Sequence, residues 1–221
     1  MLTKRTIQLG GYDTASHGWT LTGLELREPY PVQNIVEVPG RIRGALDLSL
    51  ALTGEPTYST RELYVALEIS TGDRHEREHH IMELTNLLHG RRVEIISPDR
   101  PDYYAVGQLT VTKLFNNHAH GSVEIAGVCE PWLYASQETE VVVQATATEQ
   151  TALLANLGVM SMVPQLLVTG GSVALTYADA TLSLSQGTHE WPHLYLTPGE
   201  HLIKYTGTGK LSIKYREGVI R

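Results

Sequence analysis

The stretch of sequence that most suggests chemistry is RHEREHHIMEL at positions 74–84. Within it His75, Glu76 and His79 spell H-E-x-x-H, a pattern in which two histidines on one helical face bind zinc and the glutamate polarises a zinc-bound water. A zinc peptidase also needs a third ligand and a buried helix. Here the motif falls in the first turn of the expected helix, and Met82 stands where a metzincin continuation requires glycine. We therefore interpret these residues as a solvated, charged helical turn, and expect no metal site.

Other candidates for chemistry are weaker. The sequence has no G-x-S-x-G, Walker or G-x-G-x-x-G pattern, so no catalytic serine elbow and no nucleotide cofactor is expected. Cys129 is the only cysteine, lacks an evident activating base, and is expected to pack at a strand end. Trp191 and Tyr195 in THEWPHLYL could form a sugar-stacking platform. The alternative, which we favour, is that Trp191 closes one end of a hydrophobic core.

Composition indicates an ordinary globular protein. The chain has 221 residues, 42% of them hydrophobic and 19% charged, with a net charge of −7 and no basic run. Electrostatic binding to nucleic acid is therefore not expected. One cysteine excludes an intramolecular disulfide framework. The start, MLTKRTIQLGGYDT, has no stretch suited to a signal peptide, and the apolar window 153–168 is interrupted and too short to span a membrane. We expect synthesis and assembly in a reducing cytosol.

The first 135 residues are expected to form strands with one helix on the sheet. RELYVALEIS (61–70) alternates with period two, so Leu63, Val65, Leu67 and Ile69 should share a buried face. Further strands are expected at 19–26, 45–50, 93–96, 108–114 and 122–128. From 74 to 88 the apolar spacing becomes helical, with Asp73 and Glu76 placed as a capping box and Gly90 as a stop.

The remainder of the chain is expected to be a second domain. The Thr/Ala/Val-rich segment 138–154 is interpreted as a crossing between domains. After it, LLVTG, SVALTY, ATLSLS, HLYLTPGEHLIKYTG and GKLSIKYREG follow at roughly ten-residue spacing, with glycine-rich turns between them. This pattern is typical of a β-sandwich. The sequence thus predicts a mainly β protein with domains at 1–135 and 136–221.

Four short motifs follow one another along the first part of the chain. VPGRIRGALDLSLALTGEPTYSTREL (38–63) fits the pattern VPG…G.LDLS…G…Y..R, the helix closes on LLHG, the segment 98–107 resembles DPDYYY.G, and PWLY (131–134) resembles PY.Y. The residues that fit these patterns are Pro39, Gly40, Gly44, Leu46, Asp47, Leu48, Tyr58, Arg61, Gly90, Tyr104, Gly107, Pro131, Trp132 and Tyr134. In this order the motifs resemble the distal tail protein family of siphophages and prophages.

The resemblance implies a structural hub at the tip of a non-contractile phage tail, and not an enzyme. Family members have an N-terminal β-sandwich domain with one α-helix, which assembles into a hexameric ring, and a galectin-like C-terminal β-sandwich. The implied partners are further copies of the chain, the major tail tube protein, the tape measure protein and a tail-associated, baseplate or receptor-binding protein. The implied location is the virion tail tip, after assembly in the bacterial host cytoplasm. Two rivals stay open: a carbohydrate-binding module and a zinc hydrolase.

Overall fold

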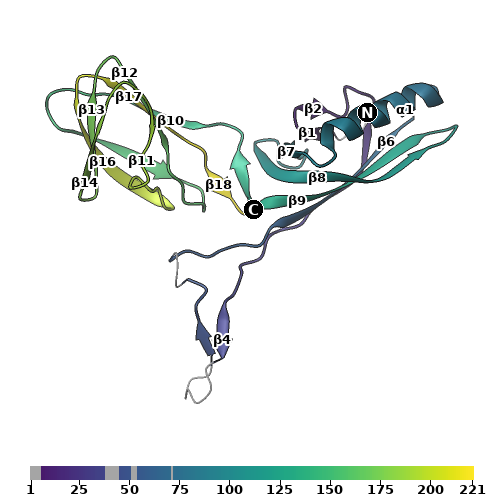
Figure 1. The fold of residues 1–221 in the computed structure, drawn as a ribbon, viewed down its shortest axis with the longest axis horizontal. Helices are drawn as coiled ribbons and strands as arrows, with labels where there is room; N and C mark the ends of the chain where they lie inside the picture. The colour runs from purple at the N-terminus through teal and green to yellow at the C-terminus, as the bar shows by residue number, and fades with distance from the viewer. Residues whose placement is uncertain (1–5, 38–44, 51–53, 71) are drawn as a thin grey trace. The chain divides into compact units, whose positions relative to one another are not determined.

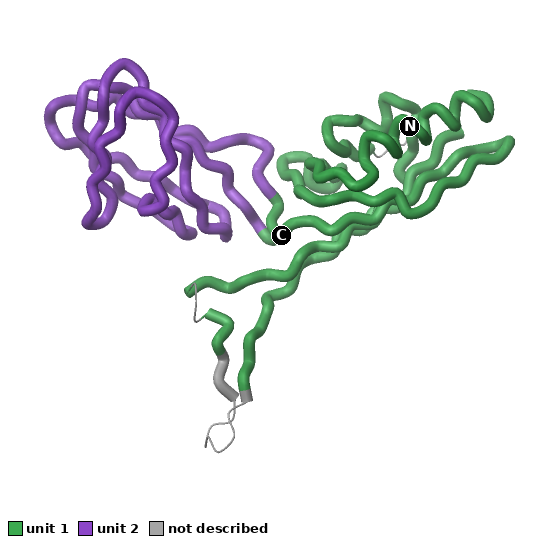
Figure 2. Tube along the Cα trace, viewed as in Figure 1, with its two compact units in different colours: residues 1–133, 220–221 green, residues 134–219 purple. Residues whose placement is uncertain are grey.

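The computed structural model describes residues 6–37, 45–50, 54–70 and 72–221, and the side chains of 37 and 45–47 are not described. The chain divides into two compact units, residues 1–133 with 220–221, and residues 134–219 (Figure 2). The mainly β fold with one helix, expected from the sequence, is confirmed (Figure 1). Among the described residues, no helix is long and apolar enough to cross a membrane.

One antiparallel sheet organises the first unit, in the order β2-β1-β7-β8-β9-β6-β3, with β18 pairing to β9 off this path. The strands β4 and β5 form a separate two-stranded sheet. The elements up to residue 135 are β1 (Gln8–Leu9), β2 (Tyr12–Asp13), β3 (Thr20–Leu26), β4 (Ile35–Glu37), β5 (Ala45–Asp47), β6 (Arg61–Ile69), α1 (Arg74–Leu88), β7 (Arg92–Ile96), β8 (Tyr103–Asn116) and β9 (Gly121–Ala135).

The core of the first unit lies between α1 and one face of this sheet. The alternation expected in β6 is confirmed, because Leu63, Val65, Leu67 and Ile69 are all buried. The helix contributes three buried apolar side chains, Ile81, Leu84 and Leu88, and packs on β8. The expected strand at 45–50 is shorter than predicted, since only 45–47 pair, with β4.

Helix α1 begins and ends as the sequence predicts. The Asp73 side chain accepts hydrogen bonds from the backbone N–H groups of His75 and Glu76, and the Glu76 carboxylate accepts one from the backbone of Asp73. This reciprocal capping box satisfies donors that the first turn would otherwise leave unpaired. After the helix Gly90 adopts a φ of +74°, a conformation that favours glycine.

The second unit is a β-sandwich of two four-stranded sheets, β10-β17-β12-β15 and β11-β16-β13-β14. The strands of this part of the chain are β10 (Thr139–Gln144), β11 (Gln150–Asn156), β12 (Gln165–Thr169), β13 (Val173–Tyr177), β14 (Ala180–Leu184), β15 (Gly187–Glu190), β16 (Gly199–Gly207), β17 (Lys210–Tyr215) and β18 (Gly218–Val219).

Two details of the second unit differ from the sequence prediction. The segment 138–154 was expected to cross between domains, but it forms β10 and most of β11, each paired along its length. Threonine and valine favour strands as readily as linkers when their neighbours can be paired, which composition alone does not show. The run HLYL (193–196) does not form a strand. Its residue Leu196 forms an isolated antiparallel β-bridge with Met162.

Candidate assembly site

Arg61 is one of two arginines that are buried among the described residues of the first unit; the other is Arg77. Arg61 is 1% exposed. Its Nε donates to the carbonyl oxygen of Pro131 at 2.7 Å, Nη2 donates to the carbonyl of Ile220, and Nη1 lies 3.5 Å from the carbonyl of Arg27. Arg61 therefore links β6 to β9, to the residue that follows β3 and to Ile220. Burial, aided by the charge of Arg100, lowers the pKa of Arg61.

Residues that neighbour Arg61 and Pro131 in the sequence form an aromatic contact. The rings of Tyr58 and Trp132 meet edge to face, with centroids 5.4 Å apart and planes at 73°. Such pairs contribute about 0.5–1.5 kcal/mol beyond the area they bury. Tyr58 precedes Arg61 by three residues and Trp132 follows Pro131, so the two motifs that carry the resemblance here, 38–63 and 131–134, contact each other twice. The sequence did not predict this pairing.

Gly107 is required by a close approach between β8 and β9. A Cβ atom at this position would lie 2.3 Å from Sγ of Cys129, and 2.9 Å from both the Cα of Cys129 and the carbonyl oxygen of Val128. Cys129 itself is 1% exposed, and burial raises the pKa of its thiol to about 11. The expectation that Cys129 packs agrees with this burial, but Cys129 lies in the interior of β9 and not at a strand end.

The remaining residues of the resemblance are distributed along the first unit and its end. Leu46 and Asp47 lie on β5 opposite Val36 and Ile35, and the N–H of Leu48 donates to the carbonyl of Asn34 at 2.8 Å. The N–H of Gly90 donates to the carbonyl of Leu109. Tyr104 lies on β8 and Tyr134 on β9. The predictions for Pro39, Gly40 and Gly44 lie outside the described residues.

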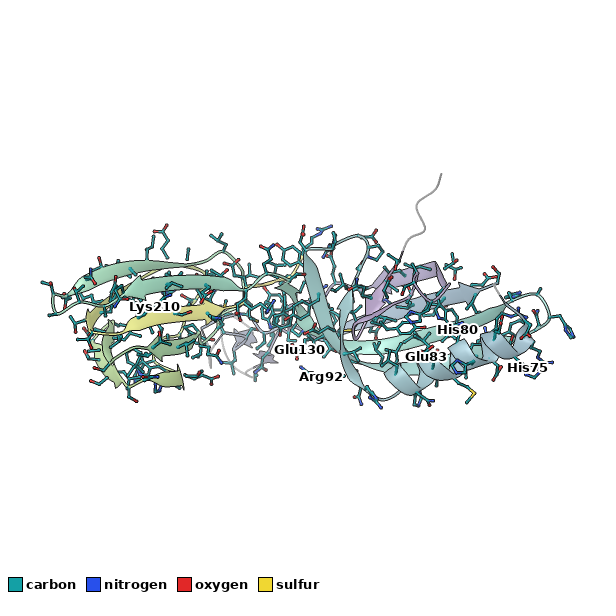
Figure 3. All side chains as sticks on the ribbon, turned by 90° about the horizontal axis from the view of Figure 1, so that it is seen from above. His75, His80, Glu83, Arg92, Glu130 and Lys210 are labelled. Atoms are coloured by element: carbon teal, nitrogen blue, oxygen red, sulfur yellow. The ribbon has the colours of Figure 1, made fainter. Side chains whose placement is uncertain are left out.

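The two histidines of the H-E-x-x-H pattern lie on the exposed side of α1. His75 and His79 are exposed, and Figure 3 shows His75 at the outer end of the helix. Across the described ranges, no group of three histidine, cysteine or acidic residues could hold a metal. The residue between the two histidines, Arg77, points inward and is 2% exposed. The pattern thus lies in the first turn of a helix that is capped by Asp73 and exposed at both histidines.

Arg77 is a buried, hydrogen-bonded side chain that the sequence analysis did not single out. Its Nη1 donates to the carbonyl of Gly72 at 2.6 Å, and Nη2 donates to the carbonyls of Asn117 and His118 at 2.8 and 3.2 Å. It thus fastens the start of α1 to the turn that joins β8 and β9. A signal was present, because Arg77 lies four residues before Ile81 and so continues the buried face 81, 84 and 88 by one turn.

The proposed sugar platform is split between the core and the surface. Trp191 is 8% exposed and packs in the hydrophobic core of the second unit, whereas Tyr195 is 45% exposed. The centroid of the Trp191 ring is 6.0 Å from that of His193. An indole buried to this extent offers little face for stacking on a ligand. The position agrees with the alternative in so far as Trp191 belongs to the core; that it closes one end of the core stays a prediction.

The face of the first sheet that is not covered by α1 carries a hollow of about 380 Å³. Its lining is mixed: Tyr64 and Val128, 40% and 57% exposed, lie among polar side chains that include Gln108 and Thr110. Along its rim Arg27 pairs with Glu25 at 2.9 Å and with Glu62 at 2.5 Å. We call this hollow the sheet-face groove; its lining residues are Glu25, Arg27, Glu62, Leu63, Tyr64, Gln108, Thr110, Ala126, Gly127 and Val128.

A second apolar surface lies on the segment that connects β3 to β6. We call its described residues, 28–37, 45–50 and 54–60, the arm. The base of the arm is held by backbone hydrogen bonds from Val32 to Thr57 and from Ser59 to Tyr30, at 2.8 and 3.0 Å. Beyond the base, β4 and β5 pair with each other in a sheet of their own (Figure 1). The exposed large apolar side chains of the arm are Tyr30, Val32, Ile35, Val36 and Leu50, at 69%, 44%, 53%, 43% and 52%.

Comparison of the sequence with known proteins yields no match. No protein-family model matches this chain, and no curated protein matches it.

Comparison of the structure with solved structures does find likenesses. The fold is similar to the crystal structure of the SPP1 Dit (gp 19.1) protein, described as a paradigm of the hub adsorption apparatus in phages that infect Gram-positive bacteria. The match has a TM-score of 0.69 at 15% identity and covers 97% of this chain and 99% of that chain. A chain in the structure of the phage p2 baseplate in its activated conformation matches with a TM-score of 0.47 at 8% identity, covering 96% of this chain and 98% of that one. The first likeness establishes that this chain has the fold of that hub protein.

Proposed function

We propose that this chain is the structural, non-enzymatic hub of a siphophage or prophage tail tip. The observation that carries the proposal is the likeness to the SPP1 Dit protein along nearly the whole of both chains. The ordered sequence motifs support it independently. Two of them are in contact, through Arg61 with Pro131 and Tyr58 with Trp132.

In this proposal the first unit closes into a hexameric ring and the second stands as a peripheral sandwich. The ring joins the tail tube, with its tape measure protein, to the tail-associated or receptor-binding apparatus, at the tip of the virion tail. The chain needs no cofactor for this role. The net charge of −7 suits a ring through which DNA must pass, because phosphates find few cationic partners on it.

The experiment that tests the proposal is a measurement of solution mass by light scattering over a range of concentrations, with imaging of the same sample by electron microscopy. A closed six-fold ring has a mass of about 146 kDa, six times the chain mass of 24.4 kDa. Ring-shaped particles of that mass would support the hub. A strictly monomeric protein at every concentration, with no rings on the grid, would contradict it.

A further inference from the structure

A second hollow in the first unit, of about 150 Å³, lies where the sheet curls on itself. Its apolar residues come from four strands: Leu24 and Leu26 of β3, Ile95 of β7, Ala105 of β8 and Leu133 of β9. Strands β7 and β3 are separated by β8, β9 and β6 in the order of the sheet, so both can line one hollow only because the sheet curls. We call this hollow the curl pocket. A cavity of this volume with an apolar lining can hold one molecule of the size of benzene.

The polar residues of the curl pocket are Glu28, which follows β3, and Ser97, Asp99, Arg100 and Tyr103, on the turn from β7 to β8. Hydrogen bonds within the turn fix its shape. The N–H of Asp99 donates to the Ser97 hydroxyl at 3.2 Å, and the N–H of Tyr103 donates to the carbonyl of Arg100 at 3.2 Å. Most of this turn belongs to the segment that resembles DPDYYY.G, a motif to which the proposed function gives no role. One apolar wall beside a few polar groups is typical of a ligand site.

The charges around the curl pocket favour an anion. Arg100 is half-buried, and its guanidinium forms no side-chain hydrogen bond or ion pair with another described residue. After burial, the charge of Arg100 is the next cause that lowers the pKa of Arg61, so the two guanidinium groups are close enough to repel each other. Of the two acidic groups in the lining, Glu28 accepts from Arg221 at 3.0 Å and Asp99 is exposed. Three arginines thus stand against two carboxylates.

We propose that the curl pocket binds a carboxylate carried on a short aliphatic group. The aliphatic part lies against Leu24 and Leu26, and the carboxylate accepts hydrogen bonds from the guanidinium of Arg100, whose planar fork matches a carboxylate. Two sources share this chemistry: the C-terminal residue of a polypeptide that ends in leucine, isoleucine or valine, and a free short-chain acid. The proposal goes beyond the hub function and does not depend on it, because ring formation does not require a guest in this pocket.

Titration of the full chain with three small molecules of one carbon skeleton, followed by NMR, tests the chemistry of the guest. The probes are isovalerate, its neutral amide isovaleramide and the cationic isoamylamine. We expect isovalerate to bind with a Kd on the order of 1 mM, and at least about tenfold more tightly than the amide, because a hydrogen bond between two charged groups is stronger than one to a neutral group. The amine should not bind. Equal binding of the acid and the amide would overturn the proposal.

Substitution of Arg100 shows whether this side chain selects the carboxylate. In Arg100→Gln, isovalerate should bind at least about tenfold more weakly and no better than the amide. This variant should stay folded, because it loses no side-chain bond to another described residue and removes a charge that repels Arg61. The control is Arg91→Gln, at an exposed position outside the pocket, which should bind isovalerate like the original chain. Unchanged binding in a folded Arg100→Gln variant overturns the proposal.

A second variant tests the apolar wall. Leu24→Trp places a larger side chain on the pocket side of β3 and should weaken isovalerate binding at least about tenfold. Its matched control is Glu25→Trp, on the opposite face of the same strand, where Glu25 lines the sheet-face groove and not the curl pocket. Circular dichroism and melting curves establish that both variants are folded. If both bind isovalerate as the original chain does, the acid lies elsewhere and the pocket is overturned.

Two short peptides distinguish the sources of the carboxylate. Acetyl-Gly-Gly-Leu has a free terminal carboxylate, and the same peptide with an amidated C-terminus does not. If the guest is a polypeptide terminus, the free peptide should bind at least about tenfold more tightly than isovalerate and the amidated peptide should not bind. If the guest is a free acid, isovalerate should bind more tightly than either peptide. Binding of none of the acids overturns the proposal, and the hub function is then still decided by the mass of the protein in solution.

Discussion

Arg61 and Pro131, 70 positions apart in the sequence, are joined by a hydrogen bond of 2.7 Å from the guanidinium Nε to the carbonyl oxygen. The same guanidinium also holds the carbonyl of Ile220. A buried charged group is tolerated when its donors are used in this way, because each hydrogen bond from a charged group contributes about 1.5–3 kcal/mol. The last two residues of the chain are thus a structural part of the first unit.

Replacement of Arg61 by methionine should lower the free energy of unfolding by roughly 3 kcal/mol, because two partly buried carbonyl groups lose their donor. The stability of Arg61→Lys should be intermediate, since a single ammonium group cannot replace all the hydrogen bonds of the guanidinium. Chemical denaturation followed by circular dichroism measures the effect. The matched control is Arg91→Met, at an exposed position, which should change stability by less than about 0.5 kcal/mol. Equal stability of Arg61→Met and Arg91→Met would refute the role given to the buried guanidinium.

Gly107→Ala should destabilise the first unit by about 1–3 kcal/mol, because the added Cβ would overlap Cys129 and the backbone of Val128. Combining it with Cys129→Ala should restore only part of the loss, since the contacts at 2.9 Å are to main-chain atoms. Gly23→Ala, whose Cβ would meet nothing closer than 3.3 Å, serves as the control. Thermal melts of the three variants check the order, and a full rescue by Cys129→Ala would show that the side chain alone sets the constraint.

The elements of the first unit were predictable where one face is buried. The alternation of 61–70 predicted β6, and the spacing of Ile81, Leu84 and Leu88 with the cap at Asp73 predicted α1 almost to the residue. The segment 138–154 was misinterpreted because its residues are half-exposed and alternate weakly in polarity. The strands that pair with a given strand can be distant in the sequence. The periodicity of a segment therefore does not show whether it will be paired in a sheet.

The candidate site was predictable only as a set of motif residues, not as an arrangement. The resemblance named Arg61, Pro131, Tyr58 and Trp132, yet nothing in the sequence indicates that they meet in pairs, because Arg61 and Pro131 are 70 positions apart. Arg77 was missed for a different reason. A charged residue in a charged helical turn is ordinarily solvated, and its burial depends on carbonyl groups supplied by a turn 40 residues later.

The double substitution of His75 and His79 by alanine should leave stability within about 0.5 kcal/mol of the original, because both side chains are exposed. Addition of zinc, or of a chelator, should not move the melting temperature of either protein. Arg77→Met, between them, should cost roughly 2–3 kcal/mol, since it leaves the carbonyls of Gly72 and Asn117 without a donor. If a chelator lowers the melting temperature of the original protein but not that of the double variant, His75 and His79 bind a metal ion.

The thiol of Cys129 should react slowly with Ellman's reagent in the folded protein. With its pKa raised to about 11 by burial, about one thiol in a thousand is ionised at pH 8. Reaction should accelerate by orders of magnitude in denaturant, where the pKa returns to its ordinary value. Following the absorbance of the released product with and without urea measures both rates. A folded-state rate equal to that of the unfolded chain would show that the β8–β9 contact opens freely.

Asp73 should make the stability of the first unit depend on pH in the acid range. Hydrogen bonds from the backbone N–H groups of Glu76 and His75 lower the pKa of its carboxyl below the usual 3.8. A carboxyl whose pKa is lower in the folded state stabilises the fold above its unfolded pKa, and that contribution disappears as the pH falls through the folded value. Asp73→Asn keeps a capping oxygen but cannot titrate, so it should stay close to the original at pH 7 while losing less stability between about pH 4 and pH 2.

Asp73→Ala is the matched control for the cap, because it removes both the capping oxygen and the titrating group. It should be less stable than the original at pH 7 and, like Asp73→Asn, should lose less stability on acidification. Melting temperatures of the original chain and the two variants, measured across this pH range, decide between the cap and other acidic groups. If the original chain and Asp73→Asn lose stability in parallel, the acid sensitivity arises elsewhere. Asp13 would then be the next carboxyl to replace, because a hydrogen bond from Thr6 is the main cause that lowers its pKa as well.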